Sequence, residues 1–160
     1  MVSTSLERQR RLRSTARRHS IIAVGLCALL SGCGSSTSPQ TGFAGKWSGE
    51  LLQPKTSGNT VFTYSMNLIV SKSEVSGTAH IAVSGQPQYY ADFGISGTTT
   101  GSQLVFAELS ITAQVPPNTG GSWCLKHGTL TLGADGKTMA GSWASTTGAC
   151  APGTLSLTRG

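Results

Sequence analysis

Apolar and polar residues alternate along most of the chain after residue 42. In two neighbouring segments the apolar positions are Tyr64, Met66, Leu68, Val70, Val75, Ala79, Ile81 and Val83, and Gly77 takes the remaining place. A period of two puts successive side chains on opposite faces, which is typical of half-buried antiparallel strands. No segment in this part of the chain has a helical period. The pattern therefore predicts an all-β domain.

Turn residues divide this region into eight expected strands. We place them near 44–52, 60–70, 74–83, 89–98, 102–114, 123–133, 137–145 and 153–159. Consecutive strands with short links favour an up-and-down meander, and closing the meander into a barrel removes its exposed edges. Such a barrel is either filled by side chains or holds one small ligand. We expect an eight-stranded antiparallel up-and-down barrel over residues 43–160.

The links between these strands differ in length. Those at 71–73, 99–101 and 134–136 are short, and Asp135-Gly136 is a strong hairpin signal. The proline-containing links at 53–59, 84–88, 115–122 and 146–152 are expected to be longer. Alternate connections of a meander lie at alternate ends. The longer links should therefore share one end, and the chain should enter and leave the barrel at the other.

Residues 1–32 have the layout of a secretory signal peptide. An arginine-rich start precedes an apolar run at 21–30, which is shorter than the roughly 20 residues of a membrane-spanning helix. The run ends in Leu30-Ser31-Gly32-Cys33, which resembles the lipobox of bacterial lipoproteins. The resemblance implies cleavage before Cys33 and acylation of its sulfur. An ordinary cleavage site beside an unrelated cysteine is the alternative, and Arg17-Arg18 leaves a twin-arginine export route open.

The lipobox resemblance also implies a location. An acylated Cys33 carries several chains, and more than one chain is enough for stable anchoring in membrane lipid. Gly34 stands where an aspartate retains lipoproteins in the inner membrane in enteric-type sorting, so the resemblance points to the outer membrane of the cell envelope. No motif distinguishes the periplasmic from the surface face. Residues 33–42 are expected to be the lipidated cysteine and a flexible, serine-rich tether.

The positive charge of the chain lies almost entirely in the leader. Six arginines and Glu7 give residues 1–32 a charge of +5, out of a formal +6 for the whole chain. The remaining domain is nearly neutral and has no basic cluster. Nucleic-acid binding needs a concentrated basic face, so we expect no nucleic-acid partner.

The cysteines indicate an oxidising compartment. Cys27 lies in the leader and Cys33 is the lipidation site, which leaves Cys124 and Cys150 as one pair. We expect a disulfide between them, worth about 3.5 kcal/mol on the chain-entropy model. The alternative is a zinc site at Cys124-x-x-His127, but the sequence offers no third and fourth ligand. We expect neither a metal nor a cofactor.

Two residues near the ends of the predicted barrel carry a family resemblance. Gly45-Lys46-Trp47 opens the first strand and Arg159 closes the last. This pair resembles the Gly-x-Trp motif and the late arginine of lipocalins and related calycin barrels. The resemblance covers residues 43–159 and implies a small barrel with the arginine packed over the indole at its closed end. It fixes no ligand. We expect no C-terminal helix after the last strand, and we find none of the other lipocalin motifs in the sequence.

Three aromatic residues flank the longer links. Tyr89, Tyr90 and Trp123 are amphipathic side chains of the kind common at binding surfaces, and they are the candidate rim-binding residues. The other interpretation is that they cap the core.

Catalysis has weak support in the sequence. No Ser-His-Asp order, carboxylate pair or metal cluster stands out, and the polar phase of its strand places His80 on the outer face. Glu108 interrupts an apolar strand and, if it pointed inward, would be an acid with a raised pKa. We favour a bulge that keeps it in solvent. We therefore expect no enzyme activity.

Two functions follow from these observations. The first is a non-catalytic binding module that takes a small apolar or amphipathic ligand at the long-link mouth. Its small inward residues would leave room in the barrel: Gly49, Gly77, Ala79, Ala91 and Gly97. The alternative is an envelope interaction protein, such as a protease or lysozyme inhibitor, that has a filled core and binds a protein through its rim.

Replacing the lipidation site tests the anchor. Cys33→Ser removes the sulfur that acylation requires, so the protein should leave the membrane fraction and appear in the soluble fraction. Fractionation and immunoblotting of the full chain measure this, with Cys27→Ser as the matched control. An unchanged membrane fraction for Cys33→Ser would refute the anchor.

Overall fold

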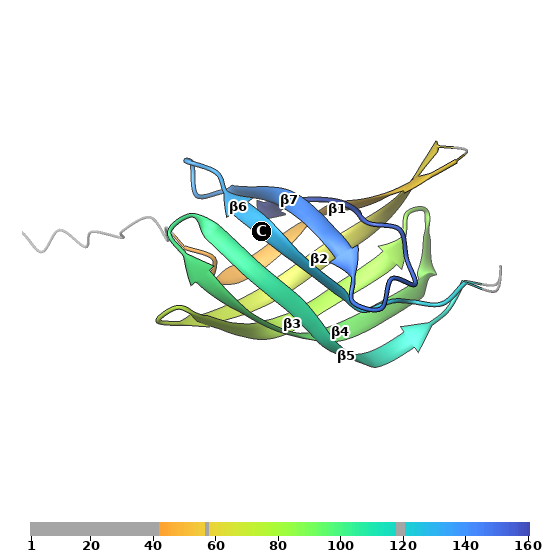
Figure 1. Cartoon of the computed structure of the whole chain (residues 1–160), viewed down its shortest axis with the longest axis horizontal. Coiled ribbons are helices and arrows are strands. Elements are labelled where there is room, and N and C mark those ends of the chain that lie inside the picture. Colours follow the sequence, from red (N-terminus) through yellow and green to blue (C-terminus); the bar gives the residue numbers. More distant parts are fainter. Residues whose placement is uncertain (1–41, 57, 118–120) are drawn as a thin grey trace, which may run out of the picture. The chain divides into compact units, whose positions relative to one another are not determined.

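The computed structural model describes residues 42–56, 58–117 and 121–160, which form a closed antiparallel β-barrel. Each strand pairs with the next along the chain, and β1 also pairs with β8 (Figure 1). The strands are β1 (Gly45–Lys55), β2 (Gly58–Ser71), β3 (Glu74–Val83), β4 (Gln86–Thr100), β5 (Gln103–Val115), β6 (Lys126–Leu132), β7 (Thr138–Ser145) and β8 (Gly153–Arg159). The predicted eight-stranded up-and-down barrel is confirmed. The expected leader at 1–32, the lipidation site Cys33 and the tether up to residue 41 lie outside the described residues.

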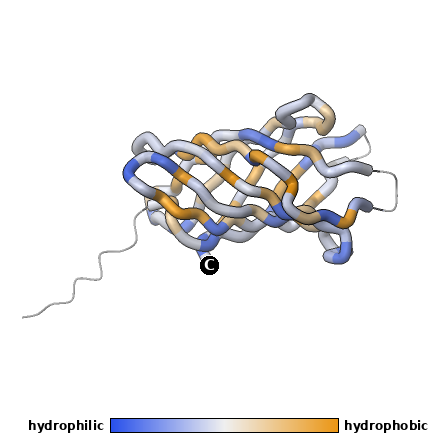
Figure 2. Tube along the Cα trace, turned by 90° about the horizontal axis from the view of Figure 1, so that it is seen from below, coloured by the Kyte–Doolittle hydropathy of each residue, from blue (hydrophilic) through white to orange (hydrophobic). Residues whose placement is uncertain are grey.

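Hydrophobic alternation decides which face of each strand points inward. Along β2, Tyr64, Met66 and Leu68 are buried, whereas Asn67 and Ile69 between and beyond them are exposed. Figure 2 shows hydrophobic and hydrophilic stretches following one another along the strands in this way. The interior is therefore apolar, and each large side chain removed from water contributes about 1.5–3 kcal/mol.

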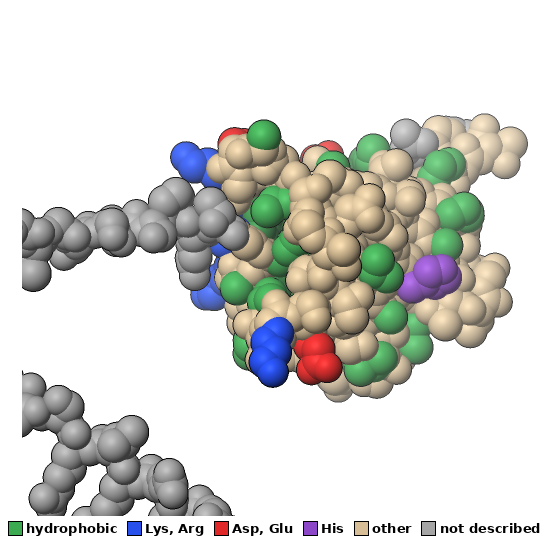
Figure 3. All heavy atoms as spheres, turned by 60° about the vertical axis from the view of Figure 1, so that its left-hand side comes forward, with side chains coloured by type: hydrophobic (Ala, Val, Ile, Leu, Met, Phe, Trp, Pro, Cys, Tyr) green, Lys and Arg blue, Asp and Glu red, His purple; other side chains and the backbone are tan. Residues whose placement is uncertain are grey.

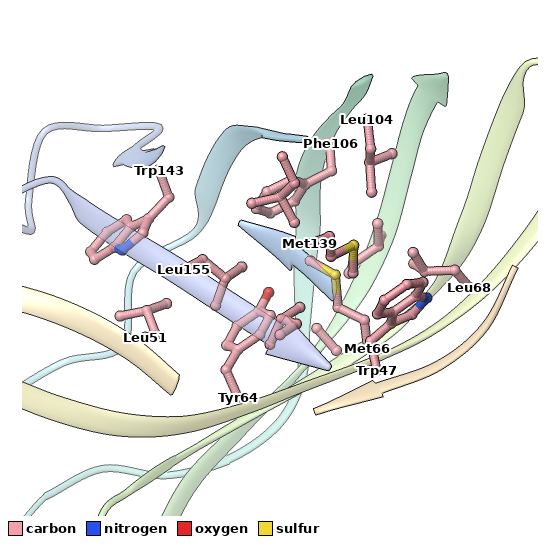
Figure 4. Close-up of a cluster of buried hydrophobic side chains, with 14 of the residues drawn as sticks. Trp47, Leu51, Tyr64, Met66, Leu68, Leu104, Phe106, Met139, Trp143 and Leu155 are labelled. Atoms are coloured by element: carbon pink, nitrogen blue, oxygen red, sulfur yellow. The ribbon is translucent and has the colours of Figure 1, made fainter. Parts of the chain in front are cut away.

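The core forms a continuous stack along the barrel axis. Trp47 and Leu68 lie at one end of the cluster, Trp143 and Leu51 at the other, and Tyr64 lies between them (Figure 4). The end with Trp47 is filled by side chains.

No helix in the described part of the chain is both long and apolar enough to cross a membrane.

The connections alternate between the two ends of the barrel, as expected for a meander. The β2–β3, β4–β5 and β6–β7 turns and the end of β8 lie together, and the other connections lie at the opposite end (Figure 1). Two links at that opposite end are nevertheless shorter than expected. Pairing of β1 with β2 continues to Lys55 and Gly58, and Val83 pairs directly with Gln86. These strands project beyond the barrel as hairpins.

The prolines that suggested long links are accommodated within these hairpins. Pro54 follows Leu52, the last residue of β1 that pairs with β8, so Pro54 has a neighbouring strand on one side only. Proline is tolerated in such edge positions and at bulges. Pro87 lies in a bulge, where the β3–β4 register shifts between Ala82 and Val83.

Arg159 closes the end of the barrel opposite these hairpins. Its guanidinium carbon lies 4.3 Å from the centroid of the Trp47 ring. Its nitrogens donate hydrogen bonds to the carbonyl oxygens of Ala44 (2.7 Å), Gly136 (3.1 Å) and Gly42. One side chain therefore joins the entry of β1, the end of β8 and the β6–β7 turn.

The backbone conformation at position 45 explains why the Gly-x-Trp segment begins with glycine. Gly45 has a φ of +115°, and a Cβ there would lie 3.2 Å from Nη1 of Arg159. The Trp47 indole is fixed from the same side, because its Nε1 donates to the Phe43 carbonyl oxygen at 2.8 Å. The backbone turn at Gly45 thus brings the arginine and the indole together.

Removing the arginine should destabilise the barrel. Arg159→Met keeps an aliphatic chain over Trp47 but loses three charged hydrogen-bond donors, so the free energy of unfolding should fall by about 2–3 kcal/mol. Urea unfolding followed by tryptophan fluorescence measures the change. The exposed Lys137→Met at the same end is the control and should change stability by less than about 0.5 kcal/mol. Equal effects of the two variants would contradict this role.

Candidate functional site

The end of the barrel opposite Arg159 contains a cavity of about 460 Å³. This volume is within the range of small-molecule sites. Residues of β1, β2, β3, β4 and β7, the first residue of β6, and the segments before β6 and after β7 line it. Its largely apolar lining includes Leu51, Phe62, Ile81, Val83, Trp123 and Trp143. By contrast, the outer face in Figure 3 is mostly uncharged, with charged and hydrophobic side chains only at scattered points.

A disulfide bond holds one side of this cavity. Cys124 and Cys150 are joined, as predicted, with their Cα atoms 6.3 Å apart, and both line the cavity. The bond ties the segment before β6 to the β7–β8 loop. Because the sulfur of Cys124 is bonded to Cys150, it is not a zinc ligand, and the described residues contain no group of His, Cys, Asp and Glu suited to a metal.

The three aromatic rim candidates do not gather at one place. Trp123 and Tyr89 both line the cavity, and the Trp123 ring meets Phe62 edge to face at 5.9 Å between centroids. Tyr90 instead stacks on His80 at 5.6 Å. Trp123 lies before β6 and not within it, because β6 begins at Lys126. Its Nε1 donates to the Val115 carbonyl oxygen at 3.1 Å, which links this segment to the end of β5.

Glu108 is buried, so the expectation that a bulge keeps it in solvent is wrong. A bulge does occur, because Ile95 pairs with Glu108 while Gly94 pairs with Ser110. The residue left without a cross-strand partner is Leu109, which is 61% exposed, whereas Glu108 is 3% exposed. The bulge therefore turns Leu109 outward and keeps Glu108 in the inward phase of β5.

Glu108 points inward because three donors meet it there. Pairing between β5 and β6 ends at Ala107 and His127, and the next N–H of β6, that of Lys126, donates to Oε2 of Glu108 at 2.8 Å. Nζ of Lys126 lies 3.0 Å from the same oxygen, and the Tyr64 hydroxyl donates to Oε1 at 2.7 Å. The carboxylate thus replaces a backbone acceptor where the two strands separate.

Lys126 is buried by its other neighbours. Its Nζ donates to the Cys124 carbonyl oxygen at 3.0 Å and lies 4.2 Å from the centroid of the Phe93 ring. Lys126 also lines the cavity, whereas Glu108 and Tyr64 lie behind it. The floor of the cavity therefore contains a buried ammonium group that is paired with Glu108, and polar side chains such as Gln53 and Lys55 also line the cavity.

Burial dominates the titration of this cluster. It raises the pKa of Glu108, against the charge of Lys126 and the hydrogen bonds from Tyr64 and Lys126. It lowers the pKa of Lys126, against the charge of Glu108. Burial and then the Glu108 charge raise the pKa of Tyr64 well above its usual value, so Tyr64 remains a donor. Both pKa shifts favour the neutral forms of Glu108 and Lys126, as expected for groups buried in a weakly polar interior.

Sequence reasoning missed Lys126, although a signal was present. Lys126 lies four residues before the buried Leu130 in the same strand. Residues an even number apart share one face of a strand, so Lys126 points inward. An inward lysine in one strand and an acidic residue within an apolar stretch of the neighbouring strand together predict a buried pair.

The small inward residues do not provide the cavity. None of Gly49, Gly77, Ala79, Ala91 and Gly97 lines it. A Cβ at Gly49 would lie 2.1 Å from the Ser156 carbonyl oxygen, and one at Gly77 would lie 2.1 Å from that of Asn67. These glycines allow neighbouring strands to approach closely. They do not leave space in the interior.

His80 lies on the outer face, as its strand phase predicted. Nδ1 of His80 is 2.7 Å from Oδ1 of Asp92, and the two side chains are 46% and 40% exposed. Ser65 is the cross-strand neighbour of His80 on the other side, so a serine, a histidine and an aspartate lie in a row over β2, β3 and β4. In the described residues no hydrogen bond joins Ser65 to His80, so the row lacks the contact between nucleophile and base that a catalytic triad needs.

Comparisons of the chain with protein-family models, with curated proteins and with solved structures found no match. The interpretation of the cavity therefore rests on its own geometry.

Removing one member of the buried pair should be more damaging than removing both. Lys126→Met leaves the Glu108 carboxylate buried without its counter-ion and should lower the free energy of unfolding by about 3–5 kcal/mol. Adding Glu108→Gln removes that charge and should restore part of the loss, because an amide oxygen still accepts one of the hydrogen bonds. Urea unfolding of the single and double variants measures the coupling. Strictly additive effects would show that the two side chains do not act as a pair.

Proposed function

We propose that the protein is a lipid-anchored module of the bacterial cell envelope that binds one small, apolar or amphipathic molecule in the mouth of its barrel. The observation that carries the proposal is the cavity of about 460 Å³, whose mostly apolar lining includes a few polar side chains and, at its floor, Lys126. Small-molecule sites typically combine mostly apolar walls with a few polar groups that orient the ligand.

The division of the barrel into two halves supports a ligand site. The half near Trp47 is filled by buried side chains and closed by Arg159. In the mouth half, Phe62 and Trp123 pack at the edge of the core and also line the cavity. A filled core throughout would have favoured the alternative of a pure interaction protein.

The proposed membrane anchor is the acylated Cys33 at the end of the lipobox-like segment. Sorting to the outer membrane is inferred from Gly34. β1 begins at the end of the barrel opposite the cavity. An anchor that precedes β1 is therefore compatible with a mouth directed away from the membrane.

One observation favours the alternative of a protein partner. β5 pairs with β6 only as far as Ala107, so the stretch from Leu109 to Val115 has a neighbouring strand on one side, and both of these apolar side chains are exposed. An unpaired strand edge is a template for β-augmentation by another chain. We keep an envelope inhibitor or interaction protein as the second candidate function.

Blocking the mouth tests the binding function. Thr60 lines the cavity on β2, and Thr60→Trp places an indole in the entrance. Binding of the neutral dye N-phenyl-1-naphthylamine, measured by its fluorescence increase, should fall at least about tenfold. Native mass spectrometry of residues 34–160 purified from an oxidising envelope should show a bound mass in the unsubstituted protein that this variant lacks.

Val61→Trp is the matched control, because Val61 neighbours Thr60 on β2 and does not line the cavity. This variant should bind the dye like the unsubstituted protein. If the unsubstituted protein carries no extra mass and binds no dye, the ligand function is wrong, and a search for a protein partner at the β5 edge follows.

A further inference from the structure

One buried donor at the mouth has no acceptor. Trp143 is 3% exposed and lines the cavity, and its Nε1 has no hydrogen-bond partner among the described residues. Figure 4 places Trp143 with Leu51 at the mouth end of the core cluster. A Cβ at residue 153 would lie 3.0 Å from Nε1, so a side chain there would crowd the N–H, and Gly153 avoids this contact. A buried N–H without an acceptor costs about 1–3 kcal/mol, so an occupant that supplies an acceptor is favoured.

The other tryptophan of the cavity differs in this respect. Nε1 of Trp123 already donates to the Val115 carbonyl oxygen. Both indoles line the cavity, but of the two only the Trp143 N–H lacks an acceptor within the described residues.

The cavity floor carries a pair of charges that is already balanced. The ammonium of Lys126 is 3.0 Å from Oε2 of Glu108, and both side chains are almost completely buried. A ligand carboxylate at Lys126 would add a second negative charge close to Glu108. The other cation in the lining, Lys55, is exposed to solvent, where its charge is screened. Burying an uncompensated charge is costly, whereas a neutral oxygen can accept a hydrogen bond there without changing the net charge.

We infer that the mouth cavity selects neutral amphiphiles that carry a hydrogen-bond-accepting oxygen, such as a ketone, ester or amide carbonyl. The inference deepens the proposed binding function and rests on it. The oxygen accepts the Trp143 indole N–H near the Lys126 floor, and the apolar body of the ligand packs against Phe62 and Trp123.

A series of three probes of similar size tests this inference. 2-Acetylnaphthalene has a neutral carbonyl, 2-ethylnaphthalene lacks the oxygen, and 2-naphthoate carries a carboxylate. Because their hydration differs, the decisive quantity is the change in each dissociation constant caused by one substitution. Trp143→Phe keeps an aromatic ring and removes the N–H. It should weaken the ketone about tenfold, the size of one net hydrogen bond, and change the ethyl compound less than about twofold.

Trp123→Phe is the matched control, since its N–H is already bonded to the protein. It should affect the ketone and the ethyl compound to the same extent. Binding of 2-ethylnaphthalene by each variant also reports that the variant is folded.

The indole N–H resonances give a second test without substitution. The domain contains three tryptophans, and each has one indole N–H signal in a ¹⁵N-labelled sample. Addition of 2-acetylnaphthalene should move the Trp143 signal downfield, and 2-ethylnaphthalene should not. The Trp47 signal is an internal reference, because its N–H donates to the Phe43 carbonyl oxygen at the closed end.

The outcomes separate the inference from the proposed function. A loss at Trp143→Phe that is specific to the ketone, with a downfield Trp143 signal, supports the inference. Equal losses for both neutral probes, or tighter binding of 2-naphthoate than of the ketone, overturn it and leave the binding function standing. If none of the three probes binds the unsubstituted protein, the inference and the proposed small-molecule function both fail.

Discussion

The hydrogen bonds and the ion pair of the Glu108 carboxylate join the strands in the mouth half of the barrel. It accepts hydrogen bonds from the Tyr64 hydroxyl and the Lys126 backbone N–H, and it pairs with the Lys126 ammonium. Three strands, β2, β5 and β6, are joined by this one side chain at the point where β5 and β6 stop pairing. Without an acceptor at this point, a buried backbone donor and a buried hydroxyl would be left unpaired, which is costly in an apolar interior.

The separation of β5 from β6 also explains why the barrel has two unlike halves. Below the separation, strand pairing is continuous, and side chains such as Leu104 and its cross-strand partner Leu130 are completely buried. Above it, the wall is completed by the segment carrying Trp123 and by the Cys124–Cys150 disulfide. A wall made of loop, aromatic rings and a disulfide cannot fill the interior as closely as paired strands do, and the cavity lies in this half.

The closed end follows a different physical logic. Arg159 stacks on Trp47 and donates to three backbone carbonyl oxygens. A planar guanidinium supplies several donors and a flat face at once, which a lysine cannot do. The geometry agrees with what the resemblance to lipocalin-type barrels implied for these two residues, while the buried Lys126–Glu108 pair near the mouth was not among its implications. The proposed ligand site therefore lies at the other end of the barrel, where the cavity is.

The sequence by itself determined the all-β class, the number and order of strands, the alternation of connections between the two ends and the disulfide, because each of these follows from local alternation, turn residues or the count of cysteines. Tertiary structure decided the inward direction of Glu108, the role of Lys126 and the separation of Tyr90 from Tyr89 and Trp123. Glu108 shares the inward parity of Leu104 and Phe106, but its carboxylate can be buried there only because donors from β2 and β6, which are distant in sequence, meet it. Whether a charged residue is buried depends on the partners it meets, and a local pattern does not contain those partners.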